Sequence, residues 1–141
     1  MWTPLVIGIV LGAKSVVAMA AAGIMRERGP YVVFMVAIAA FYPVFAVGRE
    51  PETFIFHLVI ALVFLALSFL GARTSLWWVV AAMVMHGVFD LFEGFRGPDP
   101  SPAWWGPFCL GVDVTIAIAL AWLIHRGEVP ARPGGTTFLS R

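Results

Sequence analysis

The sequence predicts an all-α protein, an integral membrane helical bundle of about five transmembrane helices. Hydrophobic residues make up 61% of the 141 residues, charged residues make up only 12%, and the mean hydropathy is +0.94. Soluble domains usually have about a quarter charged residues. The apolar residues form continuous runs without the period-two alternation of a membrane β-barrel, so the predicted spans are helices.

The boundaries of the spans follow from the charged and Pro/Gly-rich breaks, since about 20 apolar residues cross roughly 30 Å of hydrocarbon. The first run contains AMAAAG, which suits a signal peptidase, but no Lys or Arg precedes the run and Lys14 interrupts it. We therefore expect it to remain as a helix. The later breaks are RERGP, REPET, ARTS and EGFRGPDPSPAWWG. The expected spans are residues 4–25, 31–48, 54–71, 76–92 and 107–124.

These spans form one predicted transmembrane domain, residues 1–125. Residues 126–141 contain Pro, Gly and charge but little to bury, so we expect a mobile cytoplasmic tail. The orientation follows from the basic residues of the connections, which favour the cytoplasm. On one side lie Arg26, Arg28, Arg73, Arg126, Arg132 and Arg141, and on the other only Arg49 and Arg96. We expect the protein to lie in the cytoplasmic (inner) membrane of a bacterium. Its N-terminus is expected on the outer side of this membrane and its C-terminus in the cytoplasm.

Several classes of function are disfavoured. The net charge of +1 and the absence of a basic run argue against nucleic acid as a partner. A single cysteine, Cys109, cannot form an intrachain disulfide. No G-x-S-x-G and no nucleotide-binding motif occurs, so the sequence identifies no reaction. The expected partners are membrane lipid and either further copies of the chain in a homo-oligomer or a larger membrane complex.

Polar residues gather where three expected spans approach the outer side. His86, Asp90 and Glu93 are spaced i, i+4, i+7, and Cys109 and Asp113 are spaced i, i+4, so each set lies on one helix face. Imidazole, carboxylate and thiolate are the ligands that bind zinc and other transition metals. We therefore expect a pocket near the outer face that binds a divalent metal such as zinc, or protons. The expected ligands are His86, Asp90, Glu93 and Asp113, with His57 and Cys109 as further candidates.

Lys14 lies midway along the first expected helix. A lysine at the centre of a span costs roughly 2.5 to 3.5 kcal/mol on insertion, so we expect it to face the bundle interior and find a carboxylate. Asp113 is the expected partner and Asp90 the alternative. Gly8 and Gly12 form a G-x-x-x-G, which permits close helix approach.

Each polar residue also has a structural interpretation. The histidines can be hydrogen-bonded inside the bundle, Cys109 can be a packing residue, and Glu93 can end a solvated helix. The loop RGPDPSPAWWGP either covers the pocket or anchors the chain through Trp104 and Trp105. Three functions stay open: a membrane-embedded metal or proton site, in a binding protein or an enzyme; a small oligomeric carrier or channel component; and an accessory structural subunit of a larger membrane complex.

The pattern H-x-x-x-D, a Pro-rich loop and C-x-x-x-D resembles a family of small bacterial multi-pass membrane proteins of unknown function. The resemblance is best over residues 75–123. His86 and Asp90 match an H-x-x-W-D with Phe89 in place of Trp, and Glu93 and Gly94 occupy a His-His pair. Cys109 and Asp113 match a C-x-x-C-D with Val112 in place of the second Cys. The resemblance implies the helical fold and the site location, and no activity.

Overall fold

The computed structural model of the chain describes residues 2–96 and 100–135, and of residues 94–96 it describes the backbone only. This part of the chain contains five helices and no strand, which confirms the all-α bundle. The helices are α1 (Trp2–Ala21), α2 (Gly29–Phe45), α3 (Pro51–Arg73), α4 (Trp77–Arg96) and α5 (Trp105–His125).

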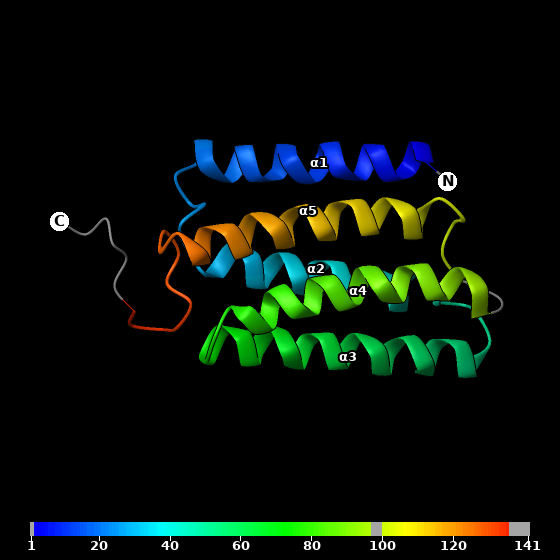
Figure 1. Cartoon of the computed structure of the whole chain (residues 1–141). Coiled ribbons are helices and arrows are strands. Elements are labelled where there is room, and N and C mark those ends of the chain that lie inside the picture. Colours follow the sequence, from blue (N-terminus) through cyan, green and yellow to red (C-terminus); the bar gives the residue numbers. More distant parts are fainter. Residues whose placement is uncertain (1, 97–99, 136–141) are drawn as a thin grey trace.

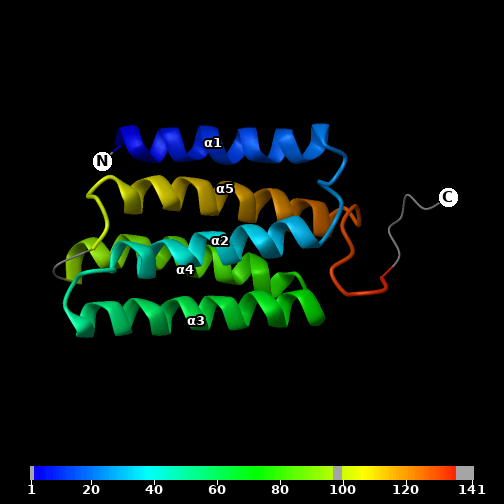
Figure 2. The same cartoon turned by 180° about the vertical axis from the view of Figure 1, so that it is seen from behind.

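Successive helices run in opposite directions, so the bundle has two distinct ends (Figure 1). The N end holds the N-terminus and the α2–α3 and α4–α5 connections, and the C end holds the other two connections and the C-terminal segment. α1 lies at one edge and packs on α5, which packs on α4. α2, α3 and α4 pack against one another on the other side of α5 (Figures 1 and 2).

α1, α3 and α5 are long and apolar enough to cross a membrane, and α2 is apolar but has only 17 residues. The helices differ in their ends from the expected spans because local backbone geometry sets these ends. α1 stops at Ala21 because Gly23 follows with φ of +75°, a conformation that breaks a helix. α4 continues four residues past the expected end at residue 92 and reaches Arg96.

Glycines hold α1 against α5. A Cβ atom on Gly8 would lie 2.1 Å from the Phe108 carbonyl oxygen, and one on Gly111 would lie 2.5 Å from the Leu5 carbonyl oxygen. The two backbones therefore approach as closely as small-residue helix pairs do in membranes. Apart from Gly8 and Gly12, no described residue of α1 is fully buried.

The C-terminal segment is fixed to the C end of the bundle, at least up to residue 131. Val129 is 1% exposed within the apolar core, and the Leu76 N–H donates to the Ala131 carbonyl oxygen at 2.8 Å. The Arg28 guanidinium donates to the carbonyl oxygens of Pro130 and Ala131. The predicted tail of residues 126–141 thus begins with a segment that packs on the bundle through one buried valine and these hydrogen bonds, and its mobility and cytoplasmic location stay predictions. Residues 136–141 lie outside the described part.

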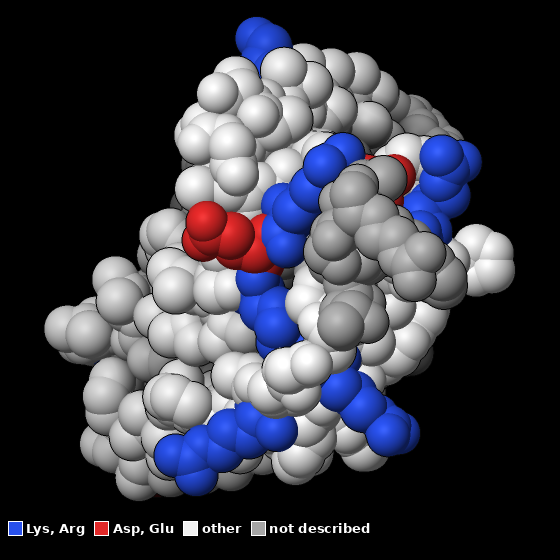
Figure 3. Space-filling model, turned by 90° about the vertical axis from the view of Figure 1, so that its left-hand side faces the viewer, with Lys and Arg blue, Asp and Glu red and all other residues white. Residues whose placement is uncertain are grey.

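Basic side chains cross the C end, which Figure 3 shows face on. Arg28 also donates to the last carbonyl oxygens of α3, Gly71 at 2.9 Å and Ala72 at 3.1 Å. Burial lowers the pKa of the Arg28 guanidinium, and these four carbonyl acceptors compensate for the lost water. Arg26 pairs with Glu128 at 3.3 Å.

Candidate metal centre

The centre of the site is a buried imidazole between two carboxylates from α4 and α5. The Nδ1 atom of His86 lies 2.9 Å from Asp113 Oδ2 and 3.4 Å from Asp90 Oδ2. One donor atom from each of the three residues lies within 4.8 Å of the other two, and the residues are only 0–3% exposed. The i, i+4 spacing on α4 and the antiparallel packing of α5 bring them together, as the sequence predicted. We call these three residues the His86 cluster.

The His86 cluster retains free coordinating capacity at Asp113. The Oδ1 atom of Asp113 is buried and has no hydrogen-bond partner among the described residues. A buried carboxylate oxygen without a donor costs free energy, so this atom has the surroundings of a cation ligand rather than of a satisfied structural group. The arrangement can bind a metal ion with one nitrogen and two or more carboxylate oxygens.

Tyr42 is a site residue that the sequence analysis missed. Its hydroxyl donates to Asp90 Oδ1 at 2.8 Å, on the carboxylate that faces His86 with its other oxygen. Its ring stacks on the imidazole of His57, with centroids 5.5 Å apart and planes 10° from parallel. The sequence did contain a signal for this role, a tyrosine within an apolar span. A buried tyrosine hydroxyl nearly always needs a hydrogen-bond partner, so a polar group was to be expected beside it.

His57 and Glu93 form a second buried pair, nearer the N end of the bundle. His57 Nδ1 lies 2.7 Å from the Thr53 carbonyl oxygen, an atom that only accepts, so Nδ1 carries the proton. His57 Nε2 lies 3.0 Å from Glu93 Oε1, and the two side chains are 2% and 6% exposed. A hydrogen bond at this distance holds one proton between them. The pair is therefore either imidazolium with carboxylate or imidazole with carboxylic acid.

Aromatic rings surround both groups and exclude water. Phe64 packs edge-on against His86 with centroids 5.0 Å apart, and Phe56 packs edge-on against His57 at 5.1 Å. The Phe89 ring lies near both imidazoles, with its centroid 6.4 Å from that of His57 and 6.3 Å from that of His86. In these low-dielectric surroundings a charge of one sign needs a compensating partner close by.

The structure groups the six predicted ligands differently from the sequence analysis. His86, Asp90 and Asp113 form one cluster, whereas Glu93 and His57 form their own pair. Glu93 lies seven residues, about 10 Å, along α4 from His86, which separates it from the cluster. Cys109 is buried beside Tyr42 and Trp105, and it is not a member of the three-residue donor group.

The expected ion pair between Lys14 and Asp113 is not formed. Lys14 is exposed on α1 and makes no ion pair among the described residues, while Asp113 is fully buried and faces His86. The reason is the rotation of α1: its glycines face α5, and Lys14 lies on the other side of the helix.

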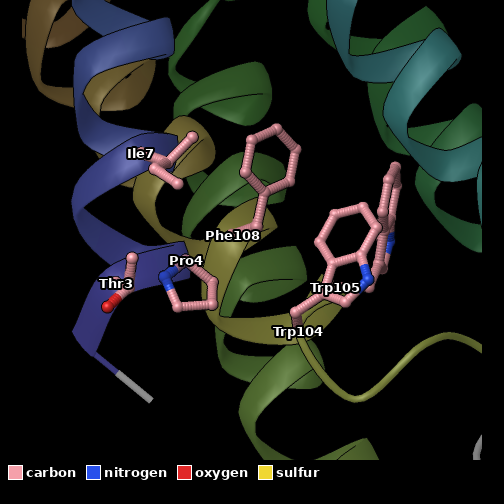
Figure 4. Close-up of a pocket in the computed structure, with 6 residues that line it drawn as sticks. All are labelled: Thr3, Pro4, Ile7, Trp104, Trp105 and Phe108. Carbon is pink, nitrogen blue, oxygen red and sulfur yellow. The ribbon is translucent and has the colours of Figure 1, made fainter.

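The tryptophans of the α4–α5 connection pack on aromatic residues. Trp105 is 9% exposed and lies 4.9 Å from the rings of both Phe41 and Phe45 in α2. Trp104 is 50% exposed beside an apolar groove of about 420 Å³ that separates it from the start of α1 (Figure 4). Trp105 is therefore part of the bundle, and the roles of this loop as a membrane anchor or as a lid stay predictions. Residues 97–99 of the loop lie outside the described residues.

Comparison of the chain with protein-family models, with curated proteins and with solved structures found no significant match. The functional argument therefore depends on the geometry of the site.

Proposed function

We propose that the protein is a multi-pass protein of the bacterial cytoplasmic membrane whose His86 cluster binds a divalent transition metal, such as zinc, in the half of the bundle nearer the outer face. The observation that carries the proposal is the geometry of His86, Asp90 and Asp113, three metal-ligand side chains within 4.8 Å of one another in an apolar interior.

The membrane location is supported by the surface of the bundle. Large apolar side chains are exposed along the helices, including Val6 at 55%, Ile55 at 57% and Ile118 at 64%. Patches of this extent are rare on soluble monomers but suit contact with lipid. The basic C end of the bundle supports a cytoplasmic C-terminus.

Charge balance favours a divalent cation in the His86 cluster. A neutral imidazole with two carboxylates carries a charge of −2, which an apolar interior does not tolerate without compensation. A divalent cation neutralises the cluster, and the Asp113 Oδ1 atom gains a partner. Asp90 is held for this role by the hydroxyl of Tyr42, in the way that outer-shell donors orient metal-binding carboxylates.

Metal analysis tests this function. The full chain, purified in mild detergent and stripped with a chelator, is dialysed against Zn²⁺ and Co²⁺, and bound metal is measured by mass spectrometry and by the visible absorption of Co²⁺. We expect about one ion per chain in the wild type and none above background in His86→Asn and Asp113→Asn.

His125→Asn is the matched control, because His125 is exposed at the C end of α5, far from the cluster. This variant should bind metal like the wild type. Uptake by the wild type that is no greater than uptake by His86→Asn would overturn the proposal.

A further inference from the structure

The side of α1 that faces away from α5 carries one charged residue in an apolar face. At about 100° per residue, seven exposed residues lie on this side, opposite the stripe of Gly8 and Gly12 that packs on α5. We call them the α1 outer face: Thr3, Val6, Val10, Ala13, Lys14, Val17 and Ala21. Small and β-branched side chains of this kind suit contact with another helix.

Lys14 cannot easily reach the membrane surface. It lies 12 residues from Trp2 and seven residues from Ala21, so about 18 Å and 10 Å of helix separate it from the two ends of α1. The shorter route leads toward the C-terminus of the helix, whereas helical side chains point toward the N-terminus. An unpaired ammonium at this depth is costly, so an anion beside Lys14 would stabilise the inserted state.

Neither this chain nor a second copy of it supplies that anion within the described residues. Asp90, Glu93 and Asp113 are buried in the site. The other described carboxylates, Glu27, Glu50, Glu52 and Glu128, lie at helix ends or in connections. A second copy would therefore meet Lys14 with an apolar surface, which leaves its charge uncompensated.

We infer that the α1 outer face binds a transmembrane helix of a different protein, and that this helix carries an Asp or Glu at the depth of Lys14. The packing of α1 agrees with this role. α1 contacts mainly α5, and the seven residues of its outer face are all exposed, so a partner helix has an apolar surface to cover around Lys14. The contact is independent of metal binding.

The test uses synthetic transmembrane helices of Leu and Ala, each with one Asp. The full chain and a peptide are reconstituted in vesicles, and association is measured by fluorescence energy transfer while the Asp is moved along the peptide. We expect strongest association when the Asp lies at the depth of Lys14, and about fivefold or more weaker association for an Asn peptide or for Lys14→Met. Association that depends neither on the Asp position nor on Lys14 would overturn the inference.

A charge-shifted variant is the matched control. Val10→Lys combined with Lys14→Met moves the ammonium four residues along the same face, and the preferred Asp position should move with it by about 6 Å. Lys14 is exposed and makes no ion pair within the described part of the chain, so Lys14→Met should keep the wild-type helicity and unfolding temperature. An unchanged Asp preference in the shifted variant would contradict the inference.

Discussion

Tyr42 connects the two buried groups of the site. Its hydroxyl bonds to Asp90 in the His86 cluster, and its ring stacks on His57 of the second pair. The hydroxyl supplies a donor to a carboxylate that also faces His86, so it fixes the direction in which Asp90 presents its other oxygen. The ring supplies packing, which does not depend on the hydroxyl.

Tyr42→Phe should therefore weaken metal binding and leave the fold intact. Loss of an outer-shell donor typically weakens metal affinity about 10- to 100-fold. The phenyl ring of the variant can keep its place against His57. The measurement is competition for Zn²⁺ with a chromophoric chelator, together with the unfolding temperature in detergent.

Tyr31→Phe is the control for this change. Tyr31 is the other tyrosine, and its hydroxyl donates to the Met25 carbonyl oxygen near the C end of the bundle, away from the cluster. Loss of the Tyr31 hydroxyl should lower the stability of the protein but leave its metal affinity unchanged. Equal affinity in Tyr42→Phe and Tyr31→Phe would show that Asp90 needs no help from Tyr42.

The His57–Glu93 pair should show strong coupling in a double-mutant cycle. Glu93→Leu leaves the His57 ring without its partner in an aromatic environment, and breaking a buried pair costs about 3–5 kcal/mol when the remaining group is charged. The double change of His57→Leu and Glu93→Leu removes both polar groups and should cost less than the sum of the single changes. Unfolding free energies of the four proteins give the coupling, and additive effects would argue against the pair.

At the scale of helices, the contact of α1 with α5 depends on three glycines. Gly111→Ala would place a Cβ atom 2.5 Å from the Leu5 carbonyl oxygen and 2.8 Å from the Ile9 backbone nitrogen. Both are backbone atoms, so relief requires the two helices to move apart. We expect a loss of about 1–3 kcal/mol, measured as a lower unfolding temperature.

Gly29→Ala provides the comparison at the start of α2, since a Cβ atom there meets nothing within 4 Å. It should change stability by less than about 0.5 kcal/mol. If Gly111→Ala were as mild as Gly29→Ala, the close approach of α1 and α5 would be wrong.

The presence of five helices could be predicted because each is a continuous apolar run between charged breaks. The ends of the helices were predicted less accurately than their presence. A glycine with positive φ, such as Gly23, ends a helix without changing the hydropathy of the sequence. The packed C-terminal segment was missed for a related reason. Val129 is one apolar residue among polar ones, and what holds the segment is hydrogen bonding of backbone carbonyls to Arg28.

The candidate site could be predicted within α4 and in part between helices. The i, i+4 spacing placed His86 beside Asp90, and the antiparallel packing of α5 on α4 brought Asp113 opposite them. The division into the His86 cluster and the His57–Glu93 pair depends on how far each residue lies along the bundle axis. Glu93 lies at the same position along this axis as His57 and therefore pairs with it. The direction of Lys14 depends on how α1 is rotated, and hydropathy alone does not determine this rotation.

At the scale of the whole molecule, the asymmetry of basic residues predicts the orientation in the membrane. The C end carries Arg26, Arg28, Arg73, Arg126 and Arg132, whereas the connection at the N end between α2 and α3 carries Arg49. Basic residues in short connections are retained in the cytoplasm, so the His86 cluster should lie in the outer half of the membrane.

Reporter fusions test this orientation. Fluorescent protein fused after Arg141 should fluoresce, and alkaline phosphatase fused there should be inactive, because it folds only outside the cytoplasm. Insertion of the phosphatase after Gly48, in the α2–α3 connection, should give the opposite result, since this connection lies at the other end of the bundle. Active phosphatase after Arg141 would invert the topology. It would place the cluster nearer the cytoplasm, where the cell's cytoplasmic metal pool rather than the external one would supply it.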